Sequence, residues 1–517
     1  MPSSLLPAFT SPDPDLEPVN ASMSLSTPPR WTFERANIPL LQGFPRRLAE
    51  IGRVLMTPRH NRVDHDLRVQ RHVQETFRRQ HLILLLCRCL ISYGAPTHRL
   101  EDYLKSTARH LEIEAHSLYY PGYMTITFDD SRTHTSEVKL AIAPEGIDLS
   151  KLSDTYKIYK PLVHDEITVE EATSRLEELV QRPKKFNMWF LILIHGCISV
   201  TVAPWAFSAQ YQDLPICFFL GCLLGFMRLY LAPKSDLHTA LFETVAVTLI
   251  TLLARGLASI VSSYPFCLSA LASSAVVPIL PGYALLMAIL ELLSKSSQAA
   301  GSVRMAYIWA YTFLLKHAFT AGAAIWGLID KNATSMPHCL NPIGYTPSHM
   351  FAVPFCICVS ILNQAKWKQM PLMVGIACMG LITGEWLRSY WTNSEAVITC
   401  FSAFCVSIAA NGYHRCQKNA LPAATTMLPA ILALVPSGLS AQGLLPAGVF
   451  EADRITKFSP VNSPTKFDQD IVLTMYFALF QISIGMATGL FLGALAVYPR
   501  GKGGQWTKDM KSGLFSF

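Results

Sequence analysis

Residues 266–293 read FCLSALASSAVVPILPGYALLMAILELL, and residues 421–446 read LPAATTMLPAILALVPSGLSAQGLLP. Both stretches are apolar and exceed the roughly 20 residues that a transmembrane helix needs. Each is interrupted near its middle by helix-breaking residues, Pro281-Gly282 in the first stretch and Pro436-Ser437-Gly438 in the second. Two broken apolar helices in one chain indicate a polytopic membrane protein that carries a site at the breaks.

Ten apolar segments of suitable length for transmembrane helices follow residue 186. They cover residues 187–207, 214–231, 237–260, 266–293, 305–328, 349–364, 371–388, 395–412, 421–446 and 470–498. The composition agrees, because 51% of the residues are hydrophobic and only 15% are charged, against about 25% in typical soluble proteins. We therefore predict an α-helical polytopic membrane protein with about ten transmembrane helices, and we exclude a soluble enzyme.

The net charge of +7 lies entirely in this apolar part of the chain. Residues 1–186 carry equal numbers of basic and acidic side chains, so the excess of Lys and Arg falls on residues 187–517. There it is concentrated in alternate loops, as the positive-inside rule expects of cytosolic loops. This pattern predicts that both termini are cytosolic and argues against a nucleic-acid partner. It does not distinguish the plasma membrane from vacuolar or other internal membranes, and it leaves the oligomeric state open.

The outer loop over residues 329–348 has two features of interest. It contains the sequon Asn332-Ala333-Thr334, so Asn332 is a candidate glycosylation site. It also contains Cys339, whereas most of the 13 cysteines lie in apolar segments. We therefore expect no intramolecular disulfide framework.

The ten segments divide into two halves of five, residues 187–328 and 349–498, followed by a basic cytosolic tail over residues 499–517. Since an odd number of helices places corresponding helices antiparallel, the halves form an inverted repeat with its breaks in matching helices. Such paired breaks indicate a transporter's binding site, although prolines can also merely shape helix packing. The candidate substrate-binding residues at the breaks are Pro281, Gly282, Pro436, Ser437 and Gly438.

Charged residues within the apolar segments are a second indication of a site. They are costly in lipid and usually face a cavity or a charged partner. Arg255 could receive a substrate carboxylate, while Glu243 and Glu291 could carry protons. The alternative is that all three residues form ion pairs that hold the helices together.

The N-terminal part of the chain has a different character. Residues 1–69 are rich in Pro and Ser at their start and are expected to be a disordered leader. Residues 70–186 combine helical and strand patterns and predict a small cytosolic α+β domain. Alternating apolar residues predict two half-buried strands, one with Met124, Ile126 and Phe128 and the next with Val138, Leu140 and Ile142.

Between these strands, the sequence FDDSRTHTSEV brings together Asp129, Asp130, His134 and Glu137. Carboxylates beside a histidine can bind a metal or act as acid and base. However, the spacing matches no metal signature, and turns between strands often carry Asp, Ser and Thr for their own hydrogen bonds. A structural or regulatory role and a hydrolytic role therefore both stay open.

Several long stretches resemble a known family. They include YGAPTHRLEDYL at residues 93–104, ILPGYALLMAILEL at 279–292, LPAILALVPSGL at 428–439 and SGLFSF at 512–517. The sequence resembles the fungal pheromone-regulated membrane protein 10-like group of the threonine/serine exporter family from about residue 75 onward. The resemblance implies a cytosolic N-terminal domain, ten membrane helices and export of small hydroxy amino acids.

Together, these observations favour a multi-pass membrane transporter that exports threonine, serine or similar small amino acids in exchange with protons. We expect no enzymatic activity, cofactor or metal, and the expected partners are the lipid bilayer, an amino-acid substrate and protons. One alternative is a non-transporting membrane protein of fungal mating or membrane organisation whose cytosolic domain binds other proteins. Another is a membrane-tethered hydrolase that uses the Asp129, Asp130 and His134 cluster.

Overall fold

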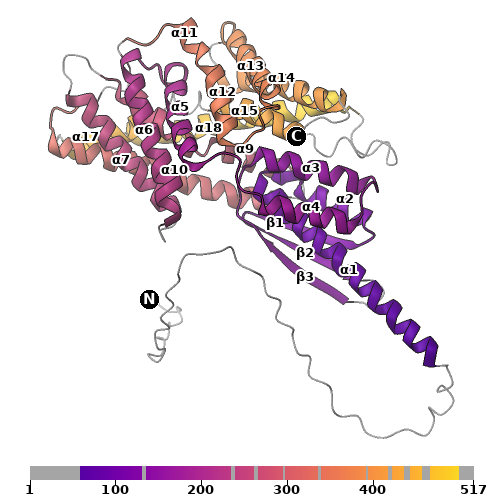
Figure 1. Ribbon diagram of the computed structural model, residues 1–517. Helices are drawn as coiled ribbons and strands as arrows, with labels where there is room; N and C mark the ends of the chain where they lie inside the picture. The colour runs from indigo at the N-terminus through magenta and orange to yellow at the C-terminus, as the bar shows by residue number, and fades with distance from the viewer. Residues whose placement is uncertain are drawn as a thin grey trace, which may run out of the picture. The chain divides into compact units, whose positions relative to one another are not determined.

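A computed structural model gives the architecture of the chain (Figure 1). The structure describes residues 59–130, 135–234, 239–260, 266–294, 297–335, 339, 341–391, 394–416, 422–435, 443–456 and 466–499. Residues 1–67 and 68–517 form two separate units. Most of the predicted leader lies outside the described residues, and its last part belongs to helix α1.

The N-terminal domain is α+β, as predicted. Its elements are α1 (Arg59–Tyr93), η2 (Thr97–Arg99), α2 (Leu100–His110), β1 (Glu114–Tyr120), β2 (Tyr123–Asp130), β3 (Thr135–Ile142), α3 (Leu149–Val163) and α4 (Val169–Gln181). The three strands form an antiparallel sheet in the order β1-β2-β3 (Figure 1). Helices α3 and α4 begin at side-chain caps, because Asp148 accepts from the Lys151 N–H and Thr168 accepts from the Glu171 N–H.

The sheet confirms one strand prediction and corrects the other. Met124, Ile126 and Phe128 of β2 are buried in a core shared with the domain's helices. In β3, by contrast, the side chains of Val138, Leu140 and Ile142 are 63%, 49% and 67% exposed, so the prediction that they are half-buried was wrong.

The register explains the error in β3. Lys139 pairs with Ile126 and therefore shares the inner face of the sheet with it, whereas Leu140 pairs with Thr125 on the outer face. The Lys139 ammonium lies 5.2 Å from the Phe77 ring centre and donates to Gln80 at 2.8 Å. The carbon chain of Lys139 can cover the edge of the core while its ammonium group binds Gln80. The alternation of apolar and polar residues in β3 therefore predicted the wrong face as the buried one.

The rest of the described chain consists of apolar helices that make it a polytopic membrane protein. These are α5 (Met188–Phe207), α6 (Leu214–Phe226), α7 (Thr239–Ile260), α8 (Leu268–Val276), α9 (Gly282–Leu293), α10 (Gln298–Ile329), α12 (Ala352–Leu362), α13 (Met370–Arg388), α14 (Glu395–Cys416), α15 (Ala423–Leu434), α17 (Leu444–Thr456) and α18 (Lys466–Val497). Helix α6 continues through a π-helical turn, η4 (Met227–Leu231), and the short α11 (Tyr345–Met350) precedes α12. Among the described residues, seven spans are long and apolar enough to cross a membrane, and the bent pair α8–α9 makes an eighth. The exact number of ten stays a prediction.

The fourth predicted segment is broken where its prolines predict. Helix α8 ends at Val276, a single 3-10 turn (η6, Val277–Ile279) follows, and α9 begins at Gly282 after Pro281. The two helices differ in direction by 46°. In the ninth segment, α15 ends at Leu434 and α17 begins at Leu444. Pro436, Ser437 and Gly438 lie outside the described residues.

Helix contacts relate the two halves of the membrane domain. Helices α7 and α10 pack together in the first half, as α14 and α18 do in the second. The second half-helix of each broken segment contacts the last helix of both halves, since α9 and α17 each contact α10 and α18. Helices α5 and α12, the first of each half, also contact each other. This reciprocal pattern is what an inverted repeat predicts.

Cys339, in the loop over residues 329–348, forms a disulfide that the sequence did not predict. Cys267 and Cys339, 72 residues apart, are bonded. Cys267 was assigned to an apolar segment, but it is the residue just before α8, where Asp213 accepts from its backbone N–H at 3.0 Å. The expectation of no intramolecular disulfide framework was therefore wrong. Cys267 precedes α8 and Cys339 follows α10, so only the tertiary structure shows that they lie close together.

Helices α14 and α18 pack closely because α18 carries glycine at every fourth position of their contact. A Cβ added at Gly489 would collide with the Cys400 carbonyl and lie 3.0 Å from the Ala403 Cβ. Gly485 and Gly493 face α14 in the same way. Small residues with this spacing allow membrane helices to approach each other.

We expect Gly489→Ala to destabilise the protein by about 1–3 kcal/mol, because the added methyl group would push the two helices apart. The thermal melting temperature of the purified chain in detergent measures the effect. Gly375→Ala is the matched control, since a Cβ there meets nothing within 4 Å. Equal melting temperatures for the two variants would contradict close packing at Gly489.

Candidate functional site

A cavity of about 620 Å³ lies at the break between α8 and α9. Residues 277–281 of the break line it, together with residues of α5, η4, α7, α9, α10, α12 and α15. The N-terminal domain contributes Gly94, Thr97 and Glu145 among others. The volume falls in the range of small-molecule sites, about 300–1,000 Å³. The break predicted from the sequence therefore faces a cavity large enough for a metabolite.

One side of the cavity carries an acid–base pair. The Arg228 Nε lies 3.7 Å from the Glu243 carboxylate, and Arg228 Nη1 donates to the Pro278 carbonyl at 3.0 Å. The Tyr311 hydroxyl donates to the other oxygen of Glu243 at 2.5 Å. The Arg228 side chain is 40% exposed and that of Glu243 is 12% exposed. Both charges therefore lie at the cavity surface, beside the broken helix.

A second charged cluster joins the membrane helices to the N-terminal domain. Arg304 of α10 donates to Glu145 at 2.9 and 3.0 Å, to Glu291 of α9 at 3.1 Å and to the Tyr119 hydroxyl at 2.8 Å. The Thr97 hydroxyl donates to Glu291, which is fully buried. We call these five residues the Arg304 cluster.

The electrostatics of the Arg304 cluster stabilise the ionised form of Glu145. Burial alone would raise the pKa of this carboxyl, but hydrogen bonds and attraction from Arg304 outweigh burial and hold the pKa below its ordinary value. The Tyr119 hydroxyl also donates to Glu145 at 2.5 Å. The domain is therefore attached at the cavity by an ionised, multiply hydrogen-bonded carboxylate.

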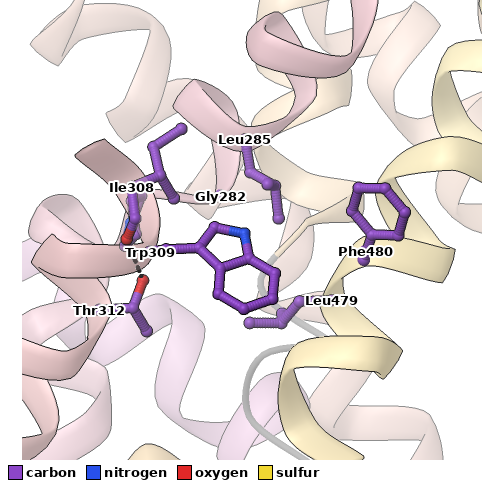
Figure 2. A pocket seen from close by; sticks show the side chains of 8 residues that line it. Gly282, Leu285, Ile308, Trp309, Thr312, Leu479 and Phe480 are labelled. Atoms are coloured by element: carbon purple, nitrogen blue, oxygen red, sulfur yellow. Dashed lines mark hydrogen bonds between the residues drawn. The ribbon is translucent and has the colours of Figure 1, made fainter. Parts of the chain in front are cut away.

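A second, much smaller pocket lies at the start of α9. Figure 2 shows the Trp309 indole of α10 between Leu285 of α9 and Leu479 and Phe480 of α18. Pro281 and Gly282 line this pocket, whose volume of about 20 Å³ suits little more than one water molecule. Its apolar lining and small size make it a packing defect beside the break, whereas the large cavity can hold a ligand.

The structure brings some predicted site residues together. Pro281 lines both pockets, and Gly282 lines the small one. Glu243 lines the large cavity, and Glu291 belongs to the Arg304 cluster.

Arg255 lies elsewhere in the structure. It is fully buried and donates to Asp453 of α17 at 2.5 Å and to the Ala323 carbonyl of α10 at 2.8 Å. Its guanidinium binds a carboxylate outside the cavity. Arg255 therefore fits the alternative interpretation, in which the intramembrane charges form ion pairs that hold the helices together.

The cluster at the β2–β3 turn is divided between the two faces of the sheet. Glu137 pairs across the strands with Phe128 on the inner face, while Asp129 points to the outer face, 3.8 Å from His116. Glu137 forms an ion pair with Lys139 at 3.2 Å. His134 and the side chain of Asp130 lie outside the described residues. The described members of the cluster do not converge on one point.

Asn332, the candidate glycosylation site, is exposed, and its backbone N–H donates to Asp330 at 2.9 Å. Exposure is compatible with modification, which stays a prediction.

Sequence reasoning missed Arg228, Tyr311, Arg304 and Glu145. The positive-inside pattern places Arg228 and Arg304 among the cytosolic loop charges, because each lies at the end of an apolar segment. The available signal was their position beside the broken helix: Arg228 ends the second segment, and Arg304 follows the fourth. Only the fold shows that both charges turn towards the break.

Comparison with known proteins shows which family the chain resembles. The family described as "Putative threonine/serine exporter" matches residues 81–326. The chain is 38% identical over 483 residues to pheromone-regulated membrane protein 10 of Debaryomyces hansenii, covering 91% of this chain and 47% of the relative. The predicted resemblance to the threonine/serine exporter family is confirmed. The protein of the same name from Candida albicans is 37% identical over 489 residues, 93% of this chain and 43% of the relative.

The family match includes the N-terminal domain, the broken helix α8–α9 and the first half of the membrane domain. The similarity to the fungal relatives extends over the second half as well, for example 36% identity over 500 residues with the Pichia sorbitophila protein, 94% of this chain and 49% of the relative. The chain spans about half the length of these curated relatives. No solved structure shows a significant match.

We expect Glu145→Gln to loosen the N-terminal domain from the membrane helices, because the amide removes the charge that binds Arg304. Hydrogen–deuterium exchange should rise in residues 93–99 and 143–148. Glu137→Gln is the control, since its ion pair lies away from the Arg304 cluster. Because the pKa of Glu145 lies below its ordinary value, the wild-type contact should persist from neutral pH to below about pH 4.3, where an ordinary glutamate is half protonated. Unchanged exchange in Glu145→Gln would contradict this role.

His98 makes the stability of the chain sensitive to acid. Its ring is buried at 6.2 Å from Phe491 of α18, and burial, with a smaller effect of Arg99, lowers its pKa to about 3. The unfolded chain takes up a proton near pH 6.5, whereas the folded chain does not. Stability should therefore fall by up to about 1.4 kcal/mol for each pH unit below 6.5.

Thermal melting between pH 7 and pH 5 measures this slope. His98→Gln should flatten it, and His116→Gln, at a site whose side chain is 82% exposed, should not. The same slope in His98→Gln would assign the acid sensitivity to other groups.

Proposed function

We propose that this protein is a transporter that exports small amino acids, with threonine and serine as the first substrates to test, and that transport is coupled to protons. The observation that carries the proposal is the Arg228–Glu243 pair at the surface of a 620 Å³ cavity beside a broken membrane helix. The family match supports a membrane transporter, and its description supports the choice of substrates.

The pair has the charges that a zwitterion needs. A substrate carboxylate would bind the Arg228 guanidinium, which presents several donors in a planar fork. The substrate ammonium would bind Glu243. The N-terminus of α9 also borders the cavity through Pro281 and Tyr283, and its positive helix dipole favours the carboxylate. In the proposed mechanism, a zwitterion inserts between two charges that lie 3.7 Å apart when the site is empty.

Proton coupling would act through Glu243. When Glu243 takes up a proton, it loses its attraction for the ammonium group, so proton binding and substrate binding compete. The Tyr311 hydroxyl, which donates to Glu243, would hold the carboxylate in position at the cavity surface. Competition for one carboxylate is sufficient to exchange an outgoing amino acid for an incoming proton.

We propose that the N-terminal domain faces the cytosol. The Lys and Arg distribution supports this orientation. The Cys267–Cys339 disulfide adds an independent argument, because disulfides persist in oxidising compartments and this one lies at the end of α10 opposite Arg304. Export would then start at the end of the cavity bordered by the N-terminal domain.

The transport test uses the full chain in proteoliposomes with a pH gradient and labelled threonine and serine. We expect gradient-driven transport by the parent protein and a loss of about 10- to 100-fold in Glu243→Gln, the cost of removing a charged hydrogen-bond partner. Residual transport in this variant should not depend on pH. Glu385→Gln, on α13 in an ion pair with Arg388, is the control and should transport normally.

The outcome separates this proposal from its rivals. Absence of transport by a correctly folded parent protein would favour a non-transporting role in fungal mating or membrane organisation. The names of the relatives connect them with pheromone regulation and say nothing of a substrate. Equal transport by the parent and Glu243→Gln would reject Glu243 as the coupling residue.

A further inference from the structure

The large cavity has a charged wall and a carbon wall. The charged wall is formed by η4, α7 and α10, which supply Arg228, Glu243 and Tyr311. Helices α5, α12 and α15 supply most of the carbon wall, and α12 contacts both α5 and α15. The members of the carbon wall are Ile198, Met287, Phe355, Val359, Leu432 and Val435. His195 of α5 also lines the cavity, near η4, and does not belong to the carbon wall.

The carbon wall is firmly packed. Phe355 is 1% exposed, and its ring packs against Trp205 of α5 with centroids 5.6 Å apart. Val359 lies one helical turn further along α12 and is 5% exposed. These six side chains have no hydroxyl, amide or charge with which to bind a polar substituent.

The size of the cavity exceeds what threonine or serine requires. A volume of about 620 Å³ lies in the middle of the range for ligands much larger than a small hydroxy amino acid. If the zwitterion is held at Arg228 and Glu243, the substrate side chain must extend towards the rest of the cavity, where the carbon wall lies.

We propose that the cavity carries neutral amino acids with branched or aromatic apolar side chains, such as leucine and phenylalanine, at least as well as threonine and serine. This inference rests on the proposed function, and it names the substrate class of the same site. The zwitterion binds at the charged wall, and the apolar side chain displaces water from the carbon wall.

The physical basis is the cost of a hydroxyl group against carbon. Threonine and valine have the same shape, and an apolar site gives the threonine hydroxyl no partner to replace water. Each further methylene buried in such a site improves affinity by about four-fold. The expected order of affinity is therefore leucine above valine, with threonine no better than valine.

The experiment is counterflow into proteoliposomes that contain the full chain and are loaded with unlabelled amino acid. Labelled leucine and labelled threonine are supplied in turn, and unlabelled leucine, valine, phenylalanine, threonine and serine serve as competitors. The proposal is supported if labelled leucine is taken up and unlabelled threonine inhibits this uptake more weakly than unlabelled valine does. Uptake of threonine and serine with no uptake or competition by leucine, valine or phenylalanine overturns it while leaving the proposed function intact. If no amino acid moves, both fail.

A variant pair tests the carbon wall directly. Val359→Thr keeps the side-chain shape and adds a hydroxyl inside the cavity, so the ratio of threonine to valine transport should rise several-fold. Val353→Thr is the matched control on the same helix, because Val353 is 40% exposed and does not line the cavity. An unchanged ratio in a Val359→Thr protein that still transports leucine would show that α12 does not contact the substrate and would overturn the proposal.

Discussion

The hydrogen bond from Arg228 to the Pro278 carbonyl links the break in the fourth segment to the chemistry of the cavity. A helix that breaks inside a bilayer exposes backbone groups that lipid cannot satisfy, so a break is tolerated only beside protein or a polar cavity. Arg228 satisfies one of these groups and also lies beside Glu243. Arg228 therefore both stabilises the broken helix and places a positive charge at the cavity surface.

The N-terminal domain is attached to the membrane helices around this cavity. The Arg304 cluster connects it to α9 and α10 through Glu145. On the other side, the Leu149 N–H donates to the Asn363 carbonyl at 3.0 Å, and Asp154 of α3 pairs with Lys366. The domain thus contacts both halves of the membrane domain, so any relative movement of the halves must be accommodated by these contacts.

Two ion pairs on α17 also join the halves, and Arg255 in one of them is fully buried. Arg255 of α7 binds Asp453 of α17, and Lys316 of α10 binds Glu451 of α17. These pairs connect the half-helix α17 to the first half, whereas Glu291 and Arg304 connect α9 to α10 within the first half. Removing Asp453 would leave the buried Arg255 charge without a carboxylate partner, which is strongly destabilising.

The sequence by itself determined the membrane class, the α+β domain, the position of the broken helix and the family resemblance. Each of these depends on local pattern: apolar length, proline position, or contiguous motifs. Tertiary structure alone decided that Arg228 and Glu243 meet, that Arg255 binds Asp453 instead of a cavity ligand, and that Cys267 reaches Cys339. It also decided which face of β3 is buried. These are contacts between segments far apart in the chain, and no local periodicity specifies which charges or cysteines will be neighbours once the helices have packed.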